Sequence, residues 1–250
     1  MKINRVASLA LLCIPLFNQL VAGQSAAPTG AVASATAAAQ QQYAAAFPLP
    51  SQLYNGPEYI DYSKPYHART GHQFFGEPTR QPGSVFYNGH HFPNLQLAYD
   101  VVRDQVVLSP PRSPLSLRLI NDNVQSFSLN NHQFVRLVAD SSNSRVIETG
   151  YYEVLLDGPV QVLARRSKRM QEHVAQQSID VEFVGQDEVF IKKAGTYYPV
   201  GRKAAALRPF ADRGKEVQDY AKAQKLAFNK SSFEASVVQL ASYYSGLPTR

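Results

Sequence analysis

The chain of 250 residues has 25 lysines and arginines against 19 aspartates and glutamates, a net charge of +6, with one cysteine and no tryptophan. A single cysteine, Cys13, excludes intramolecular disulfides and cysteine-ligated metal sites, so a hydrophobic core must stabilise the fold. The 14 tyrosines and 13 phenylalanines suit pleated β-surfaces and favour a β-rich protein.

Residues 1–23 have the pattern of a secretory signal peptide. Lys2 and Arg5 precede an apolar run, which closes on the small residues Ala22 and Gly23. Cleavage after Ala22 or Gly23 removes two cations and Cys13, and leaves 23 basic and 19 acidic residues, a net charge of +4. The sequence therefore predicts an exported protein that acts in the periplasm, at the cell surface or outside the cell.

Two alternatives to cleavage are a retained membrane anchor and a lipoprotein. A membrane-spanning helix needs about 20 continuous apolar residues, and Pro15 and Asn18 interrupt this run. A lipid-accepting cysteine normally follows a small residue, whereas Cys13 follows Leu12. We therefore expect no integral membrane span after removal of the signal.

Residues 24–49 are rich in alanine, glutamine, serine and threonine, and carry almost no charge. Such a composition cannot bury enough apolar surface to offset its ordering entropy, which predicts a disordered low-complexity tether. Residues 50–82, rich in proline, glycine and tyrosine, are expected to form an irregular arm at the start of a single domain that spans residues 50–247.

Residues 83–200 contain short runs of strand-forming residues separated by turn signals. Asn88-Gly89 is a strong two-residue hairpin signal, and Asn130-Asn131 and Asp157-Gly158 mark further turns. A strand is also expected over Leu115–Leu119, where apolar and polar residues alternate. Close spacing without intervening helices favours an antiparallel sheet.

Residues 201–247 are expected to be helical. Asp212 is placed to cap one helix, and Ser231–Glu234 reads as a capping box that opens a second. An apolar stripe at helical spacing follows along the second helix: Phe233, Val237, Leu240, Ala241 and Tyr244. The predicted fold class is α+β, mainly β: an antiparallel meander, a half-barrel or open sandwich, with a C-terminal helical hairpin packed on it.

The run Arg165-Arg166-Ser167-Lys168-Arg169 is the most concentrated charge in the chain. If the preceding strand continues through it, both faces become charged, so the strand must leave the core. One interpretation is an extended hairpin tip or a sheet edge protected by charge. The other is an anion contact through Arg165, Arg166, Lys168 and Arg169 with a lipid headgroup or an anionic glycan.

No motif identifies a catalytic residue, a cofactor or a metal. His90-His91 begins a strand, where neighbours point to opposite faces, and His67 and His72 flank a loop, so neither pair predicts a metal site. Four carboxylates near turns are candidates for an acid–base pair, although aspartate at turns usually serves turn geometry: Asp100, Asp104, Glu153 and Asp157. His132 and His173 have no evident partner.

Residues 201–250 carry nine basic and four acidic residues, but export argues against nucleic acid as the partner.

Several phrases together resemble a family of exported, uncharacterised proteins of Gram-negative bacteria. They include Gly83–Gly89, Ala98–Val107, Phe134–Leu137, Gly150–Leu155 with Val162–Arg166, Phe190–Lys193 with Tyr197–Val200, and the two closing helices. The resemblance covers about residues 71–245 and implies one structural unit with a periplasmic or surface location. It implies no activity, cofactor or catalytic residue.

Three classes of function remain open from the sequence. The first is a non-enzymatic envelope or secreted protein that binds a partner or has a structural role. The second is a periplasmic carrier for a lipid or another apolar ligand. The third is an unrecognised hydrolase. A large apolar cavity favours the carrier, a filled core with an exposed patch favours the binding protein, and carboxylates or histidines clustered in a cleft favour the enzyme.

Overall fold

The computed structural model describes residues 34, 38, 42, 52–111, 113–141, 143, 145–176 and 178–248. The chain divides into two units, Met1–Pro48 and Leu49–Arg250. In the first unit, Ser34, Ala38 and Gln42 are helical. The predicted signal peptide lies outside the described residues, as does the predicted tether apart from these three positions.

The strands of the second unit precede its main helices. The strands are β1 (Arg69–Thr70), β2 (Gln81–Tyr87), β3 (His90–Asp100), β4 (Gln105–Leu108), β5 (Leu117–Arg118), β6 (Val124–Leu129), β7 (His132–Leu137), β8 (Gly150–Leu156), β9 (Val160–Arg165), β10 (Lys168–Val174), β11 (Ile179–Gly185), β12 (Glu188–Lys193) and β13 (Thr196–Val200). The helical segments are η1 (Asn121–Asn123), α3 (Lys203–Leu207), η2 (Arg208–Arg213), α4 (Gly214–Ala223) and α5 (Phe233–Ser245).

The strands form an open ten-stranded antiparallel sheet and a three-stranded sheet. The order of the large sheet is β13-β12-β9-β8-β7-β6-β2-β3-β4-β5, and that of the small sheet is β1-β11-β10. Two meanders of the large sheet are joined where β2 pairs with β6: one is β2 to β5, and the other is β6 to β9 continued by β12 and β13. Helices α4 and α5 contact each other, and α5 packs on β8 and β9. The predicted class, mainly β with an antiparallel meander and a C-terminal helical hairpin, is confirmed.

The hairpin signals in the sequence correspond to turns with left-handed backbone. Asn88 and Gly89 have φ of 50° and 76° and join Tyr87 directly to His90 across the β2–β3 pair. Asparagine and glycine tolerate this conformation better than other residues, which is why the dipeptide predicts the turn.

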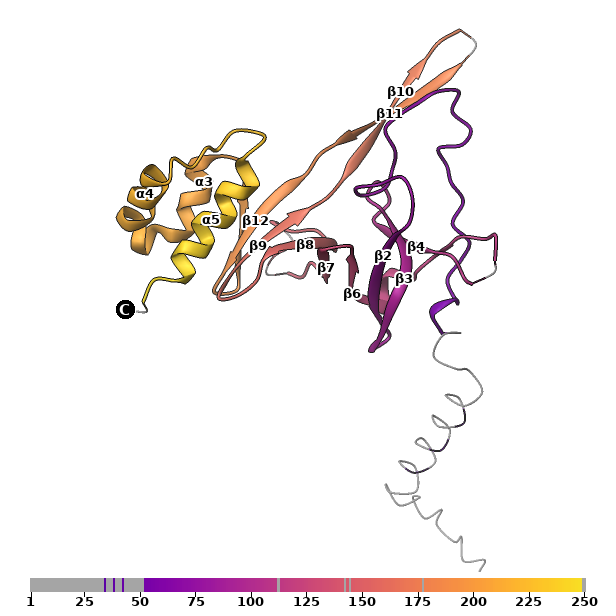
Figure 1. Ribbon diagram of the computed structural model, residues 1–250, viewed down its shortest axis with the longest axis horizontal. Helices are drawn as coiled ribbons and strands as arrows, with labels where there is room; N and C mark the ends of the chain where they lie inside the picture. Colours follow the sequence, from indigo (N-terminus) through magenta and orange to yellow (C-terminus); the bar gives the residue numbers. More distant parts are fainter. Residues whose placement is uncertain are drawn as a thin grey trace, which may run out of the picture. The chain divides into compact units, whose positions relative to one another are not determined.

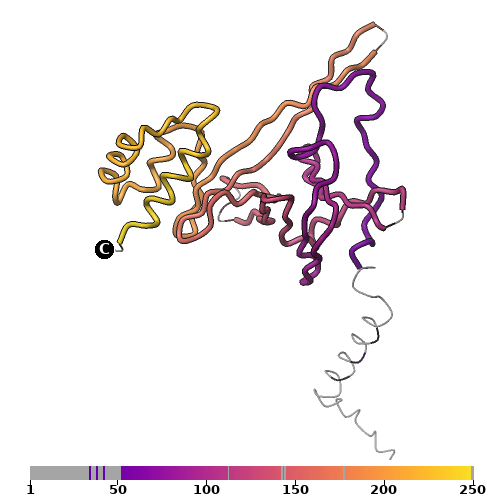
Figure 2. The backbone as a smooth tube through the Cα atoms, in the orientation of Figure 1, coloured from indigo at the N-terminus to yellow at the C-terminus, as the bar shows by residue number. Residues whose placement is uncertain are grey.

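A long two-stranded ribbon leaves the large sheet between β9 and β12. β9 pairs with β12, and after Ser167 the chain continues as β10, which pairs with β11. The ribbon extends away from the helices, which lie beside β9 and β12 (Figure 1). Figure 2 shows the segment that contains β1 running alongside this ribbon, where β1 pairs with β11 in parallel.

The inner face of the large sheet carries two hydrophobic clusters. One lies over β2 to β8 and contains four buried aromatic side chains, Tyr99, Phe127, Phe134 and Tyr151, in ring contact. The other lies between the β9, β12 and β13 strands and the helices. Val237, Leu240 and Ala241 of the predicted stripe are buried in it, and Phe233 and Tyr244 are partly buried. Hydrophobic burial therefore fixes the helices on the sheet.

Three local predictions at the helical end and at β5 were wrong. Neither half of the predicted capping box forms: Ser231 Oγ donates to Asn229 Oδ1, Ser232 stands at the N-cap without a side-chain hydrogen bond, and the Glu234 carboxylate binds Arg166. Asp212 lies within η2 and binds Lys193 and Tyr244 rather than opening α4. The strand expected over Leu115–Leu119 shortens to β5, whose outer edge is taken by residues 57–59.

Candidate functional site

A cleft of about 1190 Å³ lies between the loop before β8, the β11–β12 connection and the segment that leads into α5. Its walls include the aromatic side chains of Tyr152, Phe190, Phe228 and Phe233. Val146 also lines it with 37% of its surface exposed. The cleft is therefore an apolar surface that the fold leaves open at the junction of sheet and helices.

Charged side chains of both signs surround this apolar surface. The acidic ones are Glu148, Asp187, Glu188 and Glu234, and the basic ones are Arg145, Arg165 and Lys230. Arg165 is paired with Glu148, with 2.6 Å between Nη1 and Oε2. Arg145 and Lys230 have no ion-pair partner among the described residues. The lining of the cleft thus combines apolar and charged side chains, as small-ligand and peptide sites commonly do.

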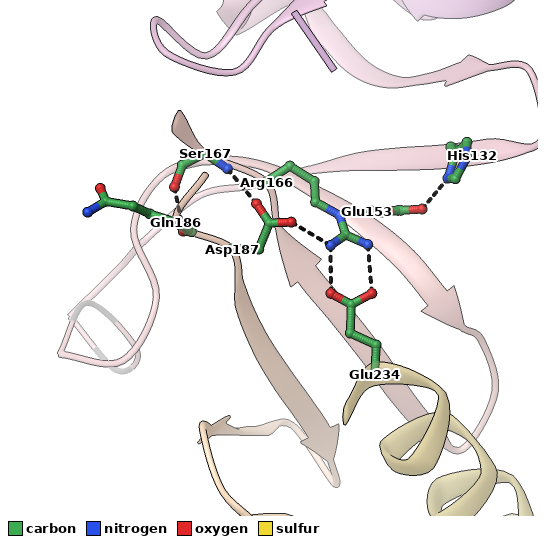
Figure 3. Close-up of polar contacts among 7 residues, drawn as sticks. All are labelled: His132, Glu153, Arg166, Ser167, Gln186, Asp187 and Glu234. Carbon is green, nitrogen blue, oxygen red and sulfur yellow. Dashed lines mark hydrogen bonds and ion pairs between the residues drawn. The ribbon is translucent and has the colours of Figure 1, made fainter. Parts of the chain in front are cut away.

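Arg166 lies behind one wall of the cleft and binds three carboxylates (Figure 3). Its Nε donates to Glu153 Oε2 at 2.6 Å, and its Nη1 donates to Asp187 Oδ2 at 2.8 Å. Nη1 and Nη2 also donate to the two oxygens of Glu234 at 2.6 and 2.9 Å, a bidentate pair. The guanidinium therefore joins three elements: β8, the connection between β11 and β12, and the first turn of α5.

Glu153 extends the network to the imidazole of His132. Its Oε1 is 2.5 Å from Nδ1 of His132, and its side chain is 4% exposed. Glu153 and His132 lie on the inner face of the sheet with Phe134, which is opposite Glu153 in the β7–β8 pair. This polar group separates the two hydrophobic clusters and receives hydrogen bonds on both carboxylate oxygens, as a buried charge requires.

The electrostatics of Arg166 favour a permanent ion cluster. Burial alone would lower the pKa of Arg166, but the hydrogen bond to Glu234 and attraction to Glu153 raise it well above the usual range. The guanidinium therefore stays charged at every physiological pH. The ion pairs of Arg166 therefore hold α5 and the β11–β12 connection against the sheet.

The four basic residues predicted as an anion contact are separated by the structure. Arg165 and Arg166 bind carboxylates, and Lys168 Nζ donates to the carbonyl oxygens of His72 and Phe74 at 2.8 and 2.7 Å. Arg169 is exposed and has no partner among the described residues. The run lies where the ribbon leaves the sheet and is not a hairpin tip, because β10 and β11 remain paired as far as Val174 and Ile179. Three of the four charges are already engaged within the protein.

The predicted acid–base candidates also lie apart. Asp100 is fully buried and accepts from the hydroxyls of Tyr59 and Tyr62 and from two backbone N–H groups. Burial raises its pKa against these hydrogen bonds. Asp104 accepts from Tyr99, and burial also raises its pKa.

Asp157 is exposed at a turn, where hydrogen bonds from Gln161 and Gly158 lower its pKa. Only Glu153 of the four joins the charged network beside the cleft.

Four of the histidines named in the sequence analysis have a local contact. His67 pairs with Asp180 at 3.3 Å, His72 Nδ1 accepts from the Phe74 N–H, and His173 lies 3.7 Å from Glu182. His90 contacts the Asn88 carbonyl. Among the described residues, no group of three or more histidines, cysteines or carboxylates is arranged to hold a metal ion.

The Glu153–Arg166–Glu234 network was missed by the sequence analysis, although one signal pointed to it. Glu153 alternates with Tyr151 and Leu155 on the core face of β8, where a charge requires a partner. Its partners are 13 and 21 residues distant in the chain, and no spacing rule identifies them.

Comparison with known proteins gives no relative. No family model matches the chain, and neither a curated protein nor a solved structure matches it. Within the described residues, no helix is both long enough and apolar enough to cross a membrane.

Proposed function

We propose that this chain is an exported, non-enzymatic envelope or secreted protein that binds a partner protein in the cleft between sheet and helices. The cleft carries the proposal, because its lining combines exposed apolar surface with charged side chains and lies beside the ion cluster of Arg166. The composition of residues 1–23 supports export, and the family that the sequence resembles is one of exported proteins.

The charged groups of the cleft support binding rather than catalysis. Asp187 and Glu234 are both held by Arg166. All four carboxylate oxygens of these two residues accept hydrogen bonds within the protein, three from Arg166 and one from the Ser167 N–H, so none is left free to accept a proton from a substrate. The hydrolase alternative gains no support from the described residues.

A carrier for a lipid or another apolar ligand is the second candidate. Val146, Phe228 and Phe233 supply apolar surface of the required kind. The charged residues in the lining favour an amphipathic ligand, since burying an unpaired charge against a lipid chain is costly. These charges therefore rank a partner protein first.

Two exposed valines provide a matched test. Val146 lines the cleft, whereas Val138 is 59% exposed and does not line it. Tagged wild type, Val146→Glu and Val138→Glu are purified from envelope extracts, and co-purifying proteins and extracted lipids are measured by mass spectrometry. We expect a protein retained by wild type and Val138→Glu to be lost from Val146→Glu. Retention by all three variants contradicts the proposal, and selective loss of a lipid instead supports the carrier.

A further inference from the structure

The edge strands of the two sheets differ in how they are protected against pairing with another strand. At one end of the large sheet, β5 is covered by residues 57–59: Arg118 N donates to Pro57 O at 3.0 Å, and Tyr59 N donates to Ser116 O at 2.7 Å. At the other end, β13 contains Pro199, which lacks an N–H to offer to another strand. The seven-residue edge strand β10 contains no proline.

Two hydrogen bonds fix the direction of the backbone groups of β10. Ala175 N donates to Ser178 O, and Gln186 N donates to Ser167 O, both at 2.9 Å. Hydrogen-bonded and non-hydrogen-bonded pairs alternate in an antiparallel ladder. The odd-numbered residues of β10 therefore bond to β11, and the even-numbered ones direct their N–H and C=O groups away from it.

Most of the outward N–H and C=O groups of β10 have no hydrogen-bond partner among the described backbone groups. Lys168 N–H lies 3.4 Å from Val101 O, which agrees with this assignment. Met170, Glu172 and Val174 have no backbone partner on that side among the described residues. A row of unpaired groups of this kind is a template for another strand.

The opposite edge of the same ribbon already carries an added segment. Val181 N donates to Ala68 O at 3.0 Å, and His67 N donates to Ile179 O at 3.0 Å, so the arm runs as a third strand beside β11. Figure 2 shows this segment along the ribbon. One edge of the ribbon therefore already carries an added strand, and its other edge is open.

We propose that the open edge of β10 binds an extended segment of a partner protein, which adds to the small sheet as an antiparallel strand. Main-chain hydrogen bonds to Met170, Glu172 and Val174 supply the affinity, as in other cases of strand addition. This site is distinct from the cleft, so the inference goes beyond the proposed function.

The side chains of the ribbon define the segment that fits. Met170 and Val174 share a face with Ile179 and Phe183, and Val174 and Ile179 are 76% and 46% exposed. Arg169, on the other face, is exposed without a charge partner among the described residues. The added strand then has an apolar residue opposite Val174, a second one four positions later opposite Met170, and an acidic residue next, opposite Arg169.

A second copy of the chain fits this edge less well. Antiparallel two-fold pairing that sets Met170 opposite Val174 of the other copy also sets the two Glu172 side chains opposite each other. Like charges directly opposite are destabilising in a sheet. The lysine that a partner segment can place opposite Glu172 has no such conflict.

The test uses a fluorescent synthetic peptide with valines opposite Val174 and Met170, lysine opposite Glu172, glutamate opposite Arg169 and threonine elsewhere. Binding to the full chain without its signal is measured by anisotropy. Val174→Pro removes one outward N–H without breaking the β10–β11 ladder, and Val174→Ile is the matched control. We expect at least a tenfold rise in Kd for Val174→Pro and little change for Val174→Ile.

A charge exchange separates recognition from misfolding. Arg169→Glu is expected to weaken binding, and a peptide with lysine in place of the glutamate is expected to restore it. Unchanged binding by Val174→Pro, or no restoration, overturns the proposal. If the chain dimerises without peptide and Val174→Pro abolishes the dimer, the edge pairs with a second copy of the chain, and the proposal is overturned. Val146→Glu is expected to bind the peptide normally, so failure at the cleft and failure at this edge are distinguishable.

Discussion

Arg166 is the residue on which the charged network depends, since Glu153 and Glu234 both rely on it. Its side chain is 12% exposed and that of Glu153 is 4% exposed. A buried ion pair contributes little compared with a well-packed apolar pair, but removal of one partner leaves a buried charge without compensation. The network is therefore sensitive to loss of a single member.

We expect Arg166→Gln to lower the free energy of unfolding by about 3 kcal/mol, because Glu153 then keeps only His132 as a partner. Glu234→Gln should have a smaller effect, since Glu234 is 36% exposed and water replaces part of the pairing. Arg169→Gln, in the same basic run, should change stability by less than about 0.5 kcal/mol. Urea denaturation checks the three variants, and equal effects of Arg166→Gln and Arg169→Gln would contradict the assigned role.

Asp100 gives a prediction on pH, because burial raises its pKa in the folded state. Its unfolded pKa is about 3.9, so the folded state binds the proton more tightly and the contribution of Asp100 to stability declines as pH rises through the folded pKa. Compared with Asp100→Asn, the wild type should therefore gain relative stability as pH falls from neutral toward the unfolded value.

Asp157 provides a control of opposite sign. Hydrogen bonds from Gln161 and Gly158 lower its pKa, so its contribution is present above the unfolded pKa and is lost as pH falls through the folded value. Denaturation of wild type, Asp100→Asn and Asp157→Asn across acid pH measures both trends. The same sign for both differences would show that the Asp100 carboxyl is not perturbed by burial.

At the scale of elements, packing of α5 on β8 and β9 holds the helices to the sheet. Leu240 is fully buried at this contact, whereas Ser242 on the same helix is exposed. We expect Leu240→Ala to lower the free energy of unfolding by about 2–5 kcal/mol, from lost burial and the cavity that remains. Ser242→Ala should have little effect. An unchanged melting temperature for Leu240→Ala would mean that the helix does not dock as described.

The elements that the sequence predicts well are those fixed by local chemistry. Asn88-Gly89 and Asn130-Asn131 adopt turns because asparagine and glycine accept positive φ, and spacing alone places Val237, Leu240 and Ala241 on one face. These signals need no knowledge of distant residues, and they were sufficient for the fold class.

The elements that failed depend on distant partners. The capping box at Ser231–Glu234 is a valid local pattern, but Arg166 offers the Glu234 carboxylate a bidentate pair with a guanidinium. A charged bidentate pair is stronger than a cap to a backbone N–H. The candidate site was missed for the same reason. The charge run identifies Arg166, but the three carboxylates that it binds come from other parts of the chain.

At the scale of the whole chain, the edge strands of the two sheets differ in how they are protected against pairing with another strand. β5 is covered, β13 contains Pro199, and β10 keeps outward N–H and C=O groups at Met170, Glu172 and Val174. Of the four edge strands, β5 and β13 are protected and β1 has only two residues, so β10 is the edge best suited to partner binding. The open edge and the cleft are separate surfaces, so the two proposed binding sites can be tested independently.

Export is the prediction that sets where such partners are found. Two charges, an apolar run and a small-residue end in residues 1–23 should direct the chain across the inner membrane, with cleavage after Ala22 or Gly23. Leu11→Arg together with Leu12→Arg places charges within the apolar run and should retain the full-length chain in the cytosol. Asn18→Ser, outside the most apolar part, should be exported normally.

Fractionation of a Gram-negative host that expresses these chains, followed by N-terminal sequencing, measures both location and cleavage. We expect the wild type and Asn18→Ser to start at Gly23 or Gln24 and to be recovered outside the cytoplasm. Recovery of wild-type chain with Met1 intact in the cytosol would contradict export. It would also return cytosolic proteins and nucleic acids to the set of partners, because the net charge of +6 then belongs to the working protein.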